Sequence, residues 1–316
     1  MPPPRLILCD GLPGSGKTTT TQQLWLHLEA CGERARWWFE HELDHPVLSF
    51  GEAREAMQAG PVEYRRALTK AHDGWAALAR GLREPGDTVL LEGTLFQATL
   101  GTQLLMDLSR AEIATHFDRT CELLAPVAPV LIHLRPADVA EALRVTCARR
   151  GAWFWDFLQG EFAATPRGRR LGRSDPAAIL DYFRERREWS DELTARFPGR
   201  VFVHDNADAD WPRQGRAISD FLGVPPIVPP PRPANAEELT GRFCAATGDE
   251  WRIVADDTGL RLVGENAPRL LPHGPDRFVI EGLCVELAFE RDAGGAIAAI
   301  RCAGSLPDLP PRWTKA

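Results

Sequence analysis

The sequence predicts a three-layer α/β/α protein with a five-stranded parallel sheet, followed by a small antiparallel β domain. Short apolar segments alternate with helix-like segments over the first 222 residues, which is typical of parallel sheets covered by helices. A proline-rich stretch at 225–235 has the composition of an extended, semi-rigid spacer. Beyond it, apolar and polar residues alternate around glycine-containing turns, as in antiparallel hairpins. The expected domains are therefore 1–224 and 236–316, joined by a linker at 225–235.

Five short apolar segments are the expected strands of the parallel sheet, because continuous apolar runs are typical of strands buried on both faces. They are Leu6–Cys9, Ala35–Phe39, Thr88–Leu91, Val130–Leu134 and Val201–Val203. Helices are expected around 17–31, 62–82, 136–150, 175–196 and 212–222. In the first helix, Leu24, Leu28 and Cys31 form an apolar stripe and Gly32 is a suitable stop. Ligands of such folds bind beyond the carboxyl ends of the strands.

Two hairpins are expected in the C-terminal domain, because period-two alternation occurs on both sides of each turn. The first joins 251–254 to 260–263, and the second joins 284–290 to 296–300. This pattern predicts a domain built mainly from antiparallel strands.

Composition narrows the possible partners and the expected location. The 316-residue chain has a formal net charge of −7, so it has no overall basic surface and nucleic acid is not an expected partner. Its seven cysteines include no Cys-x-x-Cys pair, which favours reduced thiols over disulfides or a zinc site. No apolar run approaches the roughly 20 residues of a membrane span, and no signal peptide precedes the first strand. We therefore expect a cytoplasmic protein that does not span a membrane.

The most informative stretch of the chain lies between the first expected strand and the first expected helix. Residues 11–18, GLPGSGKT, match the phosphate-binding pattern G-x-x-x-x-G-K-[ST] at every fixed position. The glycines let successive backbone N–H groups point at phosphate oxygens. Lys17 would reach the β and γ phosphates, and the Thr18 hydroxyl would hold a magnesium ion. The expected nucleotide-binding residues here are Gly11, Pro13, Gly14, Ser15, Gly16, Lys17, Thr18 and Thr19.

A polar segment, Glu40–His45, follows the second expected strand, where side chains point toward the γ-phosphate. A kinase needs a carboxylate there to accept the proton of the attacking hydroxyl. Glu40 is the first candidate for this base and Asp44 is the second, while His41 and His45 would assist substrate binding. Two alternatives stay open. The histidines and carboxylates would form a metal site, or the segment would be an exposed loop without a catalytic role.

The third expected strand ends in an acid, Glu92. An apolar strand that ends in a carboxylate is what a magnesium site beside a phosphate-binding loop requires. Glu92 would bind the metal ion directly or through water, together with Thr18. Gln97, a few residues later, would hydrogen-bond a substrate.

Arg149 and Arg150 end the helix expected at 136–150, next to Gly151 and an aromatic cluster at 153–155. Arginine forks stabilise the charge that develops during phosphoryl transfer, and this composition is typical of a mobile lid. The alternative is a solvated helix whose arginine stems pack on tryptophan. After the last expected strand, Asn206 is expected to contact adenine, although the acidic residues around it would also cap the next helix.

Two other groups of arginines have different expected roles. Arginines at 167, 169, 170 and 173 lie in an expected loop that would clamp an anionic substrate or remain solvated. Arginines at 184, 186 and 187 share a helix with Glu185 and Glu188, so pairing within that helix explains much of them.

These residues together resemble the P-loop small-molecule kinases, the group that contains nucleoside, nucleotide, shikimate and chloramphenicol kinases. The resemblance covers roughly 1–222 and rests on the stretch 11–19, Glu40, Glu92, Arg149 and Arg150. It implies a five-stranded parallel sheet, ATP with Mg²⁺ as phosphate donor, and an acid after the second strand that acts as base. Deoxynucleoside-kinase-like proteins carry Glu-Arg-Ser after the third strand, where this chain has Glu-Gly-Thr at 92–94. This departure removes the arginine and leaves a nucleoside substrate open.

The C-terminal domain faintly resembles small accessory β domains attached to serine β-lactamase-like proteins. Phe278, Leu287, residues 289–291 and the Gly294-Gly295 pair carry that resemblance. The domain has no Ser-x-x-Lys motif, so no hydrolase activity is expected. It would cover the kinase site, bind substrate or mediate an oligomer.

The expected activity is therefore an ATP- and Mg²⁺-dependent kinase that phosphorylates a hydroxyl of a metabolite, a nucleoside-like compound or an antibiotic. A kinase of polynucleotide ends or nucleotide sugars is one alternative. An ATPase or nucleotide switch that acts through a protein partner is the other. Five residues predict an aromatic-lined cleft for the acceptor: Phe50, Tyr64, Trp75, Phe96 and Gln97.

Overall fold

The computed structural model describes residues 3–42, 44–228, 230–264, 267–304 and 309–316. The chain divides into two compact units, Met1–Ile227 and Val228–Ala316. The division falls inside the expected linker. Before it, Ile227 N donates to Ser219 Oγ at 2.9 Å, so the first residues of the linker pack onto the first unit. Pro229 of that linker and Leu43 of the polar segment lie outside the described residues.

The first unit contains a five-stranded sheet in which all strands are parallel, which confirms the predicted fold class. Its strands are β1 (Leu6–Gly11), β2 (Ala35–Trp38), β3 (Thr88–Glu92), β4 (Val130–Leu134) and β5 (Arg200–His204). Their order in the sheet is β2-β3-β1-β4-β5. Strands β2 and β3 lie on one side of β1, and β4 and β5 lie on its other side, so the strand order reverses at β1. In this topology, ligands are expected in the crevice at the carboxyl end of β1.

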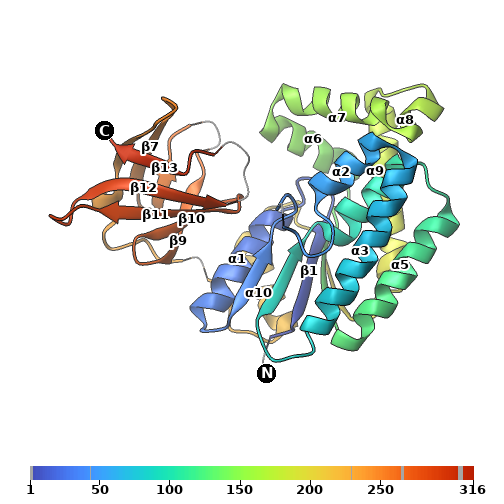
Figure 1. Ribbon diagram of the computed structural model, residues 1–316, viewed down its shortest axis with the longest axis horizontal. Coiled ribbons are helices and arrows are strands. Elements are labelled where there is room, and N and C mark those ends of the chain that lie inside the picture. Colours follow the sequence, from blue (N-terminus) through green and yellow to red (C-terminus); the bar gives the residue numbers. More distant parts are fainter. Residues whose placement is uncertain (1–2, 43, 229, 265–266, 305–308) are drawn as a thin grey trace. The chain divides into compact units, whose positions relative to one another are not determined.

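Helices cover both faces of this sheet. They are α1 (Lys17–Ala30), α2 (Phe50–Ala59), α3 (Pro61–Gly81), α4 (Thr102–Leu105), α5 (Arg110–Leu124), α6 (Val139–Arg150), α7 (Ala152–Ala164), α8 (Pro166–Leu171), α9 (Pro176–Thr194) and α10 (Trp211–Leu222), with a π-helix, η1 (Thr94–Gly101), and a short 3₁₀ turn, η2 (Ala125–Val127). Figure 1 shows α1 and α10 on one face, and α3, α5 and α9 on the other. This arrangement is the predicted three-layer architecture.

The larger core lies between the sheet and helices α3, α5 and α9. Leu8, Leu91 and Leu131 from the strands pack in one cluster with Trp75 of α3 and Phe117 of α5. Alternate strand residues point to opposite faces, so the strands carry apolar side chains on both sides and read as continuous apolar runs. That is why the strand predictions agree with the structure to within two residues at each end.

The arginine-rich stretch at 167–173 is not the loop that the sequence predicts. Residues Pro166–Leu171 form α8, because Thr165 caps the helix by accepting a hydrogen bond from Gly168 N and a proline occupies its first turn. Its arginines pair with other parts of the unit, for example Arg170 with Asp107. None of residues 167–173 lines the pocket described below, so the expected anion clamp is not formed there.

The second unit is a closed barrel of antiparallel strands. They are β6 (Gly241–Ala245), β7 (Glu250–Asp256), β8 (Gly259–Leu262), β9 (Arg269–Gly274), β10 (Arg277–Ile280), β11 (Val285–Arg291), β12 (Ile297–Gly304) and β13 (Arg312–Lys315), preceded by a 3₁₀ turn, η3 (Ala236–Leu239). Both predicted hairpins are present, as β7–β8 and β11–β12. Pairing of β13 with β6 and of β9 with β10 closes the barrel around Phe243, Phe278 and Leu287.

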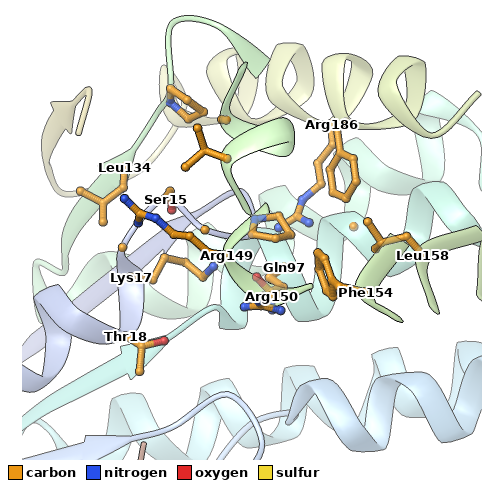
Figure 2. A pocket seen from close by; sticks show the side chains of 18 of the residues that line it. Ser15, Lys17, Thr18, Gln97, Leu134, Arg149, Arg150, Phe154, Leu158 and Arg186 are labelled. Carbon is orange, nitrogen blue, oxygen red and sulfur yellow. The ribbon is translucent and has the colours of Figure 1, made fainter. Parts of the chain in front are cut away.

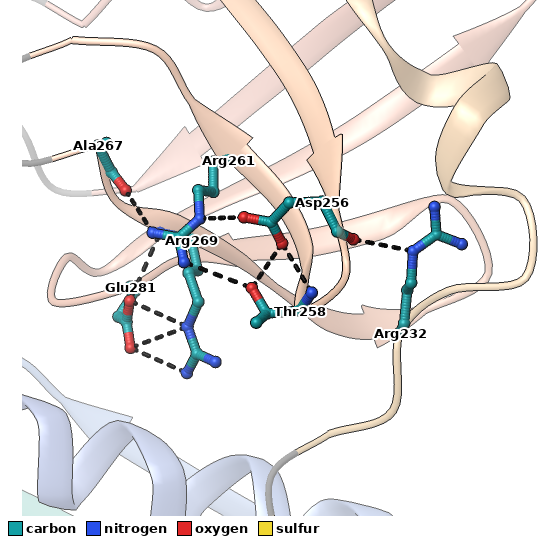
Figure 3. Close-up of polar contacts among 7 residues, drawn as sticks. All are labelled: Arg232, Asp256, Thr258, Arg261, Ala267, Arg269 and Glu281. Carbon is teal, nitrogen blue, oxygen red and sulfur yellow. Dashed lines mark hydrogen bonds and ion pairs between the residues drawn. The ribbon is translucent and has the colours of Figure 1, made fainter.

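A network of paired charges covers part of the barrel surface (Figure 3). Arg261 pairs with Asp256, and Arg269 donates from Nε and Nη2 to the carboxylate of Glu281 at 3.0–3.3 Å. Arg232 Nε donates to the carbonyl oxygen of Asp256 at 3.0 Å. Exposed pairs of this kind contribute about 0–1 kcal/mol each, so the barrel depends mainly on its apolar interior.

Two further observations concern the helices and the cysteines. Among the helices in the described part of the chain, none combines the length and apolarity that a membrane crossing requires. All seven cysteines are free thiols.

Replacing Leu131, which is fully buried at the centre of β4, by alanine should destabilise the first unit by about 2–5 kcal/mol, because the truncation leaves a cavity. The measurement is urea unfolding followed by far-ultraviolet circular dichroism, since every α-helix of the described residues lies in the first unit. The control is Val62→Ala, at a side chain that is 72% exposed, which should change the free energy of unfolding by less than about 0.5 kcal/mol. Equal effects of the two substitutions would contradict the core assignment.

Candidate active site

The phosphate-binding pattern lies where the fold predicts a ligand site, between β1 and α1. Residues 13–19 line one end of a pocket of about 760 Å³. Figure 2 shows Ser15, Lys17 and Thr18 along this end of the pocket, and the arginines and aromatic side chains that face them. Of the expected nucleotide-binding residues in this stretch, Gly11 alone does not line the pocket. It is buried at the last position of β1.

Two glycines of the loop cannot be replaced without strain. Gly14 and Gly16 have φ angles of 76° and 91°, in the left-handed region that favours glycine. A Cβ atom on Gly14 would overlap Thr146 Oγ1 of α6, and one on Gly16 would lie 2.6 Å from the ring of Trp211. The loop is therefore held tightly between α6 and the start of α10.

The start of α1 has the properties of an anion site. Its N-cap, Gly16, supplies no side-chain cap, and its first turn contains no acidic residue. Lys17 is 5% exposed, and its Nζ donates to Leu12 O at 3.2 Å. Ser15 Oγ is buried without a hydrogen-bonding partner among the described residues. Phosphate oxygens would satisfy the uncapped N–H groups, the ammonium and the hydroxyl at once.

Glu40 lines the same pocket, two residues after β2 ends. Gln97 Nε2 donates to Glu40 Oε2 at 2.6 Å, and His41 Nε2 lies 3.4 Å from Glu40 Oε1. Burial raises the pKa of Glu40, but the hydrogen bond with His41 and the charge of Lys17 outweigh burial and hold the pKa below its ordinary value. Glu40 is therefore an ionised carboxylate in a fixed orientation.

The other polar side chains of this segment lie outside the pocket or make structural contacts. Asp44 is exposed and does not line the pocket. Glu42 pairs with Arg36, and His45 Nδ1 accepts hydrogen bonds from the backbone N–H groups of residues 47 and 48 at 3.2 Å. In the part of the chain that the structure describes, no group of three or more histidine, cysteine or acidic side chains could hold a metal ion. The geometry thus favours Glu40 over Asp44 and gives the metal-site alternative no support.

Glu92, at the carboxyl end of β3, lies directly behind the phosphate-binding loop. It is fully buried, and Thr18 Oγ1 donates a short hydrogen bond to its Oε1. Its other oxygen, Oε2, lacks a hydrogen bond of ordinary geometry with the described residues. Burial and the neighbouring charge of Glu40 raise the pKa of Glu92.

A magnesium ion fits this pair of residues. Mg²⁺ is usually bound by one or two carboxylates together with substrate phosphates and waters, and not by a cage of protein side chains. Thr18 and Glu92 provide one hydroxyl and one carboxylate, and a cation beside Glu92 would offset its buried charge. Glu92 itself does not line the pocket, so contact with the ion would pass through Thr18 or require a small shift of that side chain.

Asp10 is a buried carboxylate that the sequence analysis missed. It accepts hydrogen bonds from the backbone N–H groups of Leu95 and Phe96 at 2.9 and 2.8 Å, and from that of Gly11 at 2.9 Å. These bonds fix the first turn of η1 against β1. An acid at the end of a strand, next to a glycine loop, is the sequence signal that would have identified it.

Besides Arg54 of α2, three arginines line the pocket. Arg149 and Arg150 end α6, as predicted, and the Arg150 guanidinium lies 4.5 Å above the Phe154 ring of α7. Arg144 pairs with Glu141 instead. The third arginine, Arg186 of α9, is visible at the top of the pocket in Figure 2.

The expected pairing of Arg186 within its helix is wrong. Arg184 and Arg187 contact aspartates three and four residues away, but Arg186 is 3% exposed and its Nη2 donates to Gly11 O at 3.2 Å. Its Nε is buried without a partner among the described residues. Packing of α9 against η1 turns this side chain inward, and nothing in the local sequence distinguishes Arg186 from its neighbours.

The far end of the pocket, beyond the loop, has the features of a site for a nucleotide base. Asn206, after β5, lines it together with Leu134, Val145 and Trp211. Asn206 Oδ1 is buried without a partner among the described residues. The expected helix cap is present, because Asp210 caps α10 by accepting from Arg213 N at 3.0 Å. The contact of Asn206 with adenine stays a prediction.

The predicted aromatic cleft is partly wrong. Phe50 and Gln97 line the pocket, but Tyr64, Trp75 and Phe96 are at most 1% exposed and belong to the core. Further aromatic lining comes from α7 and α9, of which the sequence analysis treated the start of α7 as part of a lid.

Comparisons of the sequence with protein-family models and with curated proteins find no match. The five-stranded all-parallel sheet with its helices is compatible with a P-loop-like α/β core. The site is therefore interpreted from its own geometry.

Gly16→Ala should weaken ATP binding by about tenfold or more, because alanine resists the left-handed conformation and its methyl group displaces Trp211 from the loop. Isothermal titration calorimetry measures the affinity. Gly81→Ala is the matched control, since that glycine ends α3 with open space around it and should bind ATP as the unaltered protein does. Unchanged affinity of Gly16→Ala would contradict a nucleotide site at this loop.

Proposed function

We propose that the first unit is an ATP- and Mg²⁺-dependent kinase of the P-loop small-molecule class, and that it transfers the γ-phosphate to a hydroxyl group of a small molecule. The observation that carries this proposal is that the loop at 13–19 and Glu40 line a single pocket. A phosphate-binding loop alone is compatible with an ATPase or a switch. A fixed, ionised carboxylate in the same pocket adds the base that transfer to a hydroxyl requires.

The transfer would proceed as an in-line displacement. The acceptor oxygen forms a bond to the γ-phosphorus while the bond from that phosphorus to the β,γ-bridging oxygen breaks, and ADP leaves with the electron pair of the broken bond. Glu40 accepts the proton of the acceptor hydroxyl. Its contacts with Gln97 and His41 orient the carboxylate, so little reorganisation is needed when the proton moves.

The remaining pocket residues would bind the nucleotide and stabilise the negative charge of its phosphates. Lys17 would bind the transferring phosphate from the loop side, and Arg149, Arg150 and Arg186 would approach it from α6 and α9. Thr18 and Glu92 would hold the magnesium ion, which when bound neutralises phosphate oxygens. Asn206 would contact the adenine base.

Lys17→Ala should remove phosphate transfer, because the ammonium is the cation that the loop places among the phosphates. The test incubates the protein with γ-labelled ATP, Mg²⁺ and pooled hydroxyl compounds, and measures labelled product. We expect a loss of about 10²-fold or more with circular dichroism unchanged. Full transfer by Lys17→Ala would contradict the assigned loop. Label that appears only as free phosphate with every pool would favour the ATPase or switch.

Glu40→Gln should lower the transfer rate by about 10²-fold or more, with the affinity for ATP retained, because glutamine keeps the hydrogen bond but accepts no proton. Asp44→Asn is the matched control, and its exposed position predicts a rate close to that of the unaltered protein. Single-turnover kinetics separate the chemical step from binding. If Asp44→Asn is the inactive variant and Glu40→Gln is active, the base lies four residues further along the chain.

A further inference from the structure

The pocket extends past Glu40 into a region between α2 and α7, which we call the acceptor end. Its lining residues are Phe50, Arg54 and Met57 of α2, and Trp153, Phe157, Leu158 and Glu161 of α7. In Figure 2, Leu158 lies at the opposite end of the pocket from Leu134, with Gln97 and Arg150 between them. The acceptor end is thus separate from the part that would hold the base and phosphates.

Aromatic side chains form an open apolar surface at the acceptor end. Trp153 is 61% exposed and Phe157 is 36% exposed, although most aromatic rings of this unit are buried. The Phe157 ring lies 6.2 Å from that of Phe154, almost parallel to it, and 6.3 Å from that of Trp153. Removing the surface of such rings from water is favourable, so this surface favours an apolar ligand that carries a ring.

The two charged side chains of the acceptor end neutralise each other. Arg54 Nε and Nη2 donate to the two carboxylate oxygens of Glu161, both at 2.7 Å, which is the bidentate geometry of a strong pair. The Arg54 guanidinium also lies 5.5 Å from the centre of the Phe157 ring. Arg54 is therefore not available to bind a phosphate or carboxylate group of an acceptor.

Glu40 would repel an anionic acceptor and attract a hydroxyl proton. Glu40 has no arginine partner among the described residues, and it is held by the amide of Gln97 and by His41 at 3.4 Å. Arg150 stands at the border, stacked on Phe154, where the transferring phosphate requires it.

We propose that the acceptor is an uncharged alcohol that carries an aromatic ring, with the ring on the Phe157 surface and the hydroxyl beside Glu40. Phosphorylated and carboxylated alcohols are disfavoured, because Arg54 is paired with Glu161 and His41, whose ring lies 5.6 Å from that of Phe50, is paired with Glu40. This inference rests on the proposed kinase function, and it narrows the substrate from any small hydroxyl compound to one chemical class.

The first experiment offers γ-labelled ATP and Mg²⁺ with three pools: uncharged aromatic alcohols, uncharged aliphatic alcohols and sugars, and aromatic alcohols that carry a phosphate or carboxylate. The expected result is a labelled product in the first pool, absent with Lys17→Ala. A product confined to either other pool would overturn the acceptor class while keeping the kinase. Nucleoside and nucleoside monophosphate form a matched pair within the first and third pools.

Binding is measured separately, so that failure of the kinase and failure of the acceptor class can be told apart. Thermal unfolding with each pool and a non-hydrolysable ATP analogue reports binding without chemistry. Stabilisation by the first pool alone, without transfer, would support the acceptor class and contradict the kinase. No stabilisation by the first pool and no product from it would overturn the acceptor class.

Two variants then test the residues that carry the argument. Phe157→Ala should raise KM for the aromatic acceptor by about tenfold with kcat little changed, because the ring contact is lost equally before and during transfer. Leu171→Ala removes an equally exposed apolar side chain outside the pocket and should leave KM unchanged. An unchanged KM for Phe157→Ala would overturn the proposed ring site.

Glu161→Gln frees the charge of Arg54 and should shift specificity toward acidic acceptors. The ratio of kcat/KM for a carboxylated aromatic alcohol to that for its uncharged counterpart should rise by about tenfold. A general loosening of α7 would lower both values together and leave the ratio unchanged, which would contradict the discrimination against anions by the Arg54–Glu161 pair.

Discussion

A buried lysine at the carboxyl edge of the sheet is the constraint on which the first unit depends. Lys17 is 5% exposed, and an ammonium ion removed from water is costly unless opposite charges and hydrogen bonds surround it. Leu12 O accepts one hydrogen bond, and the charge of Lys17 acts on the carboxylates of Asp10, Glu40 and Glu92. These come from the end of β1, the segment after β2 and the end of β3. The sheet order β2-β3-β1 therefore decides which carboxylates stabilise the lysine.

One of these carboxylates, Asp10, is linked to the proposed base, Glu40, through the π-helix η1. Asp10 holds the N–H groups of Leu95 and Phe96, so it fixes the first turn of η1. The next residue, Gln97, donates to Glu40. Asp10 does not line the pocket, and its effect on chemistry would be to position Gln97 and thereby Glu40. A regular α-helix starting after β3 would turn Gln97 by a different angle, which gives the unusual helix a structural role in the site.

Sequence reasoning succeeded where structure is local. The strands are continuous apolar runs, and the turn between β1 and α1 follows from a contiguous glycine-rich pattern. Capping boxes at Ser49–Glu52 and Ser109–Glu112 were visible signals that would have predicted α2 and α5. Prediction from the sequence failed where residues far apart in the chain determine the local structure. The hydrogen bonds that start η1 span 85 and 86 residues, the inward turn of Arg186 depends on packing of α9, and closure of the barrel joins its first strand to its last.

The arginines of the two units differ in the partners of their guanidinium groups. In the barrel, Arg261 and Arg269 are matched with carboxylates, and their charges are satisfied within the chain. At the pocket, Arg186 is buried with an unpartnered Nε and a carbonyl oxygen as its acceptor. The charge of Arg186 acts on the buried carboxylate of Asp10, but its Nε has no acceptor among the described residues, which lowers the stability of the ligand-free protein. A phosphate oxygen beside Arg186 would supply that acceptor. Ligand binding would then offset the free energy that is lost by burying Arg186. Because an anion offsets this loss more fully than a neutral ligand does, the pocket would favour a polyanion.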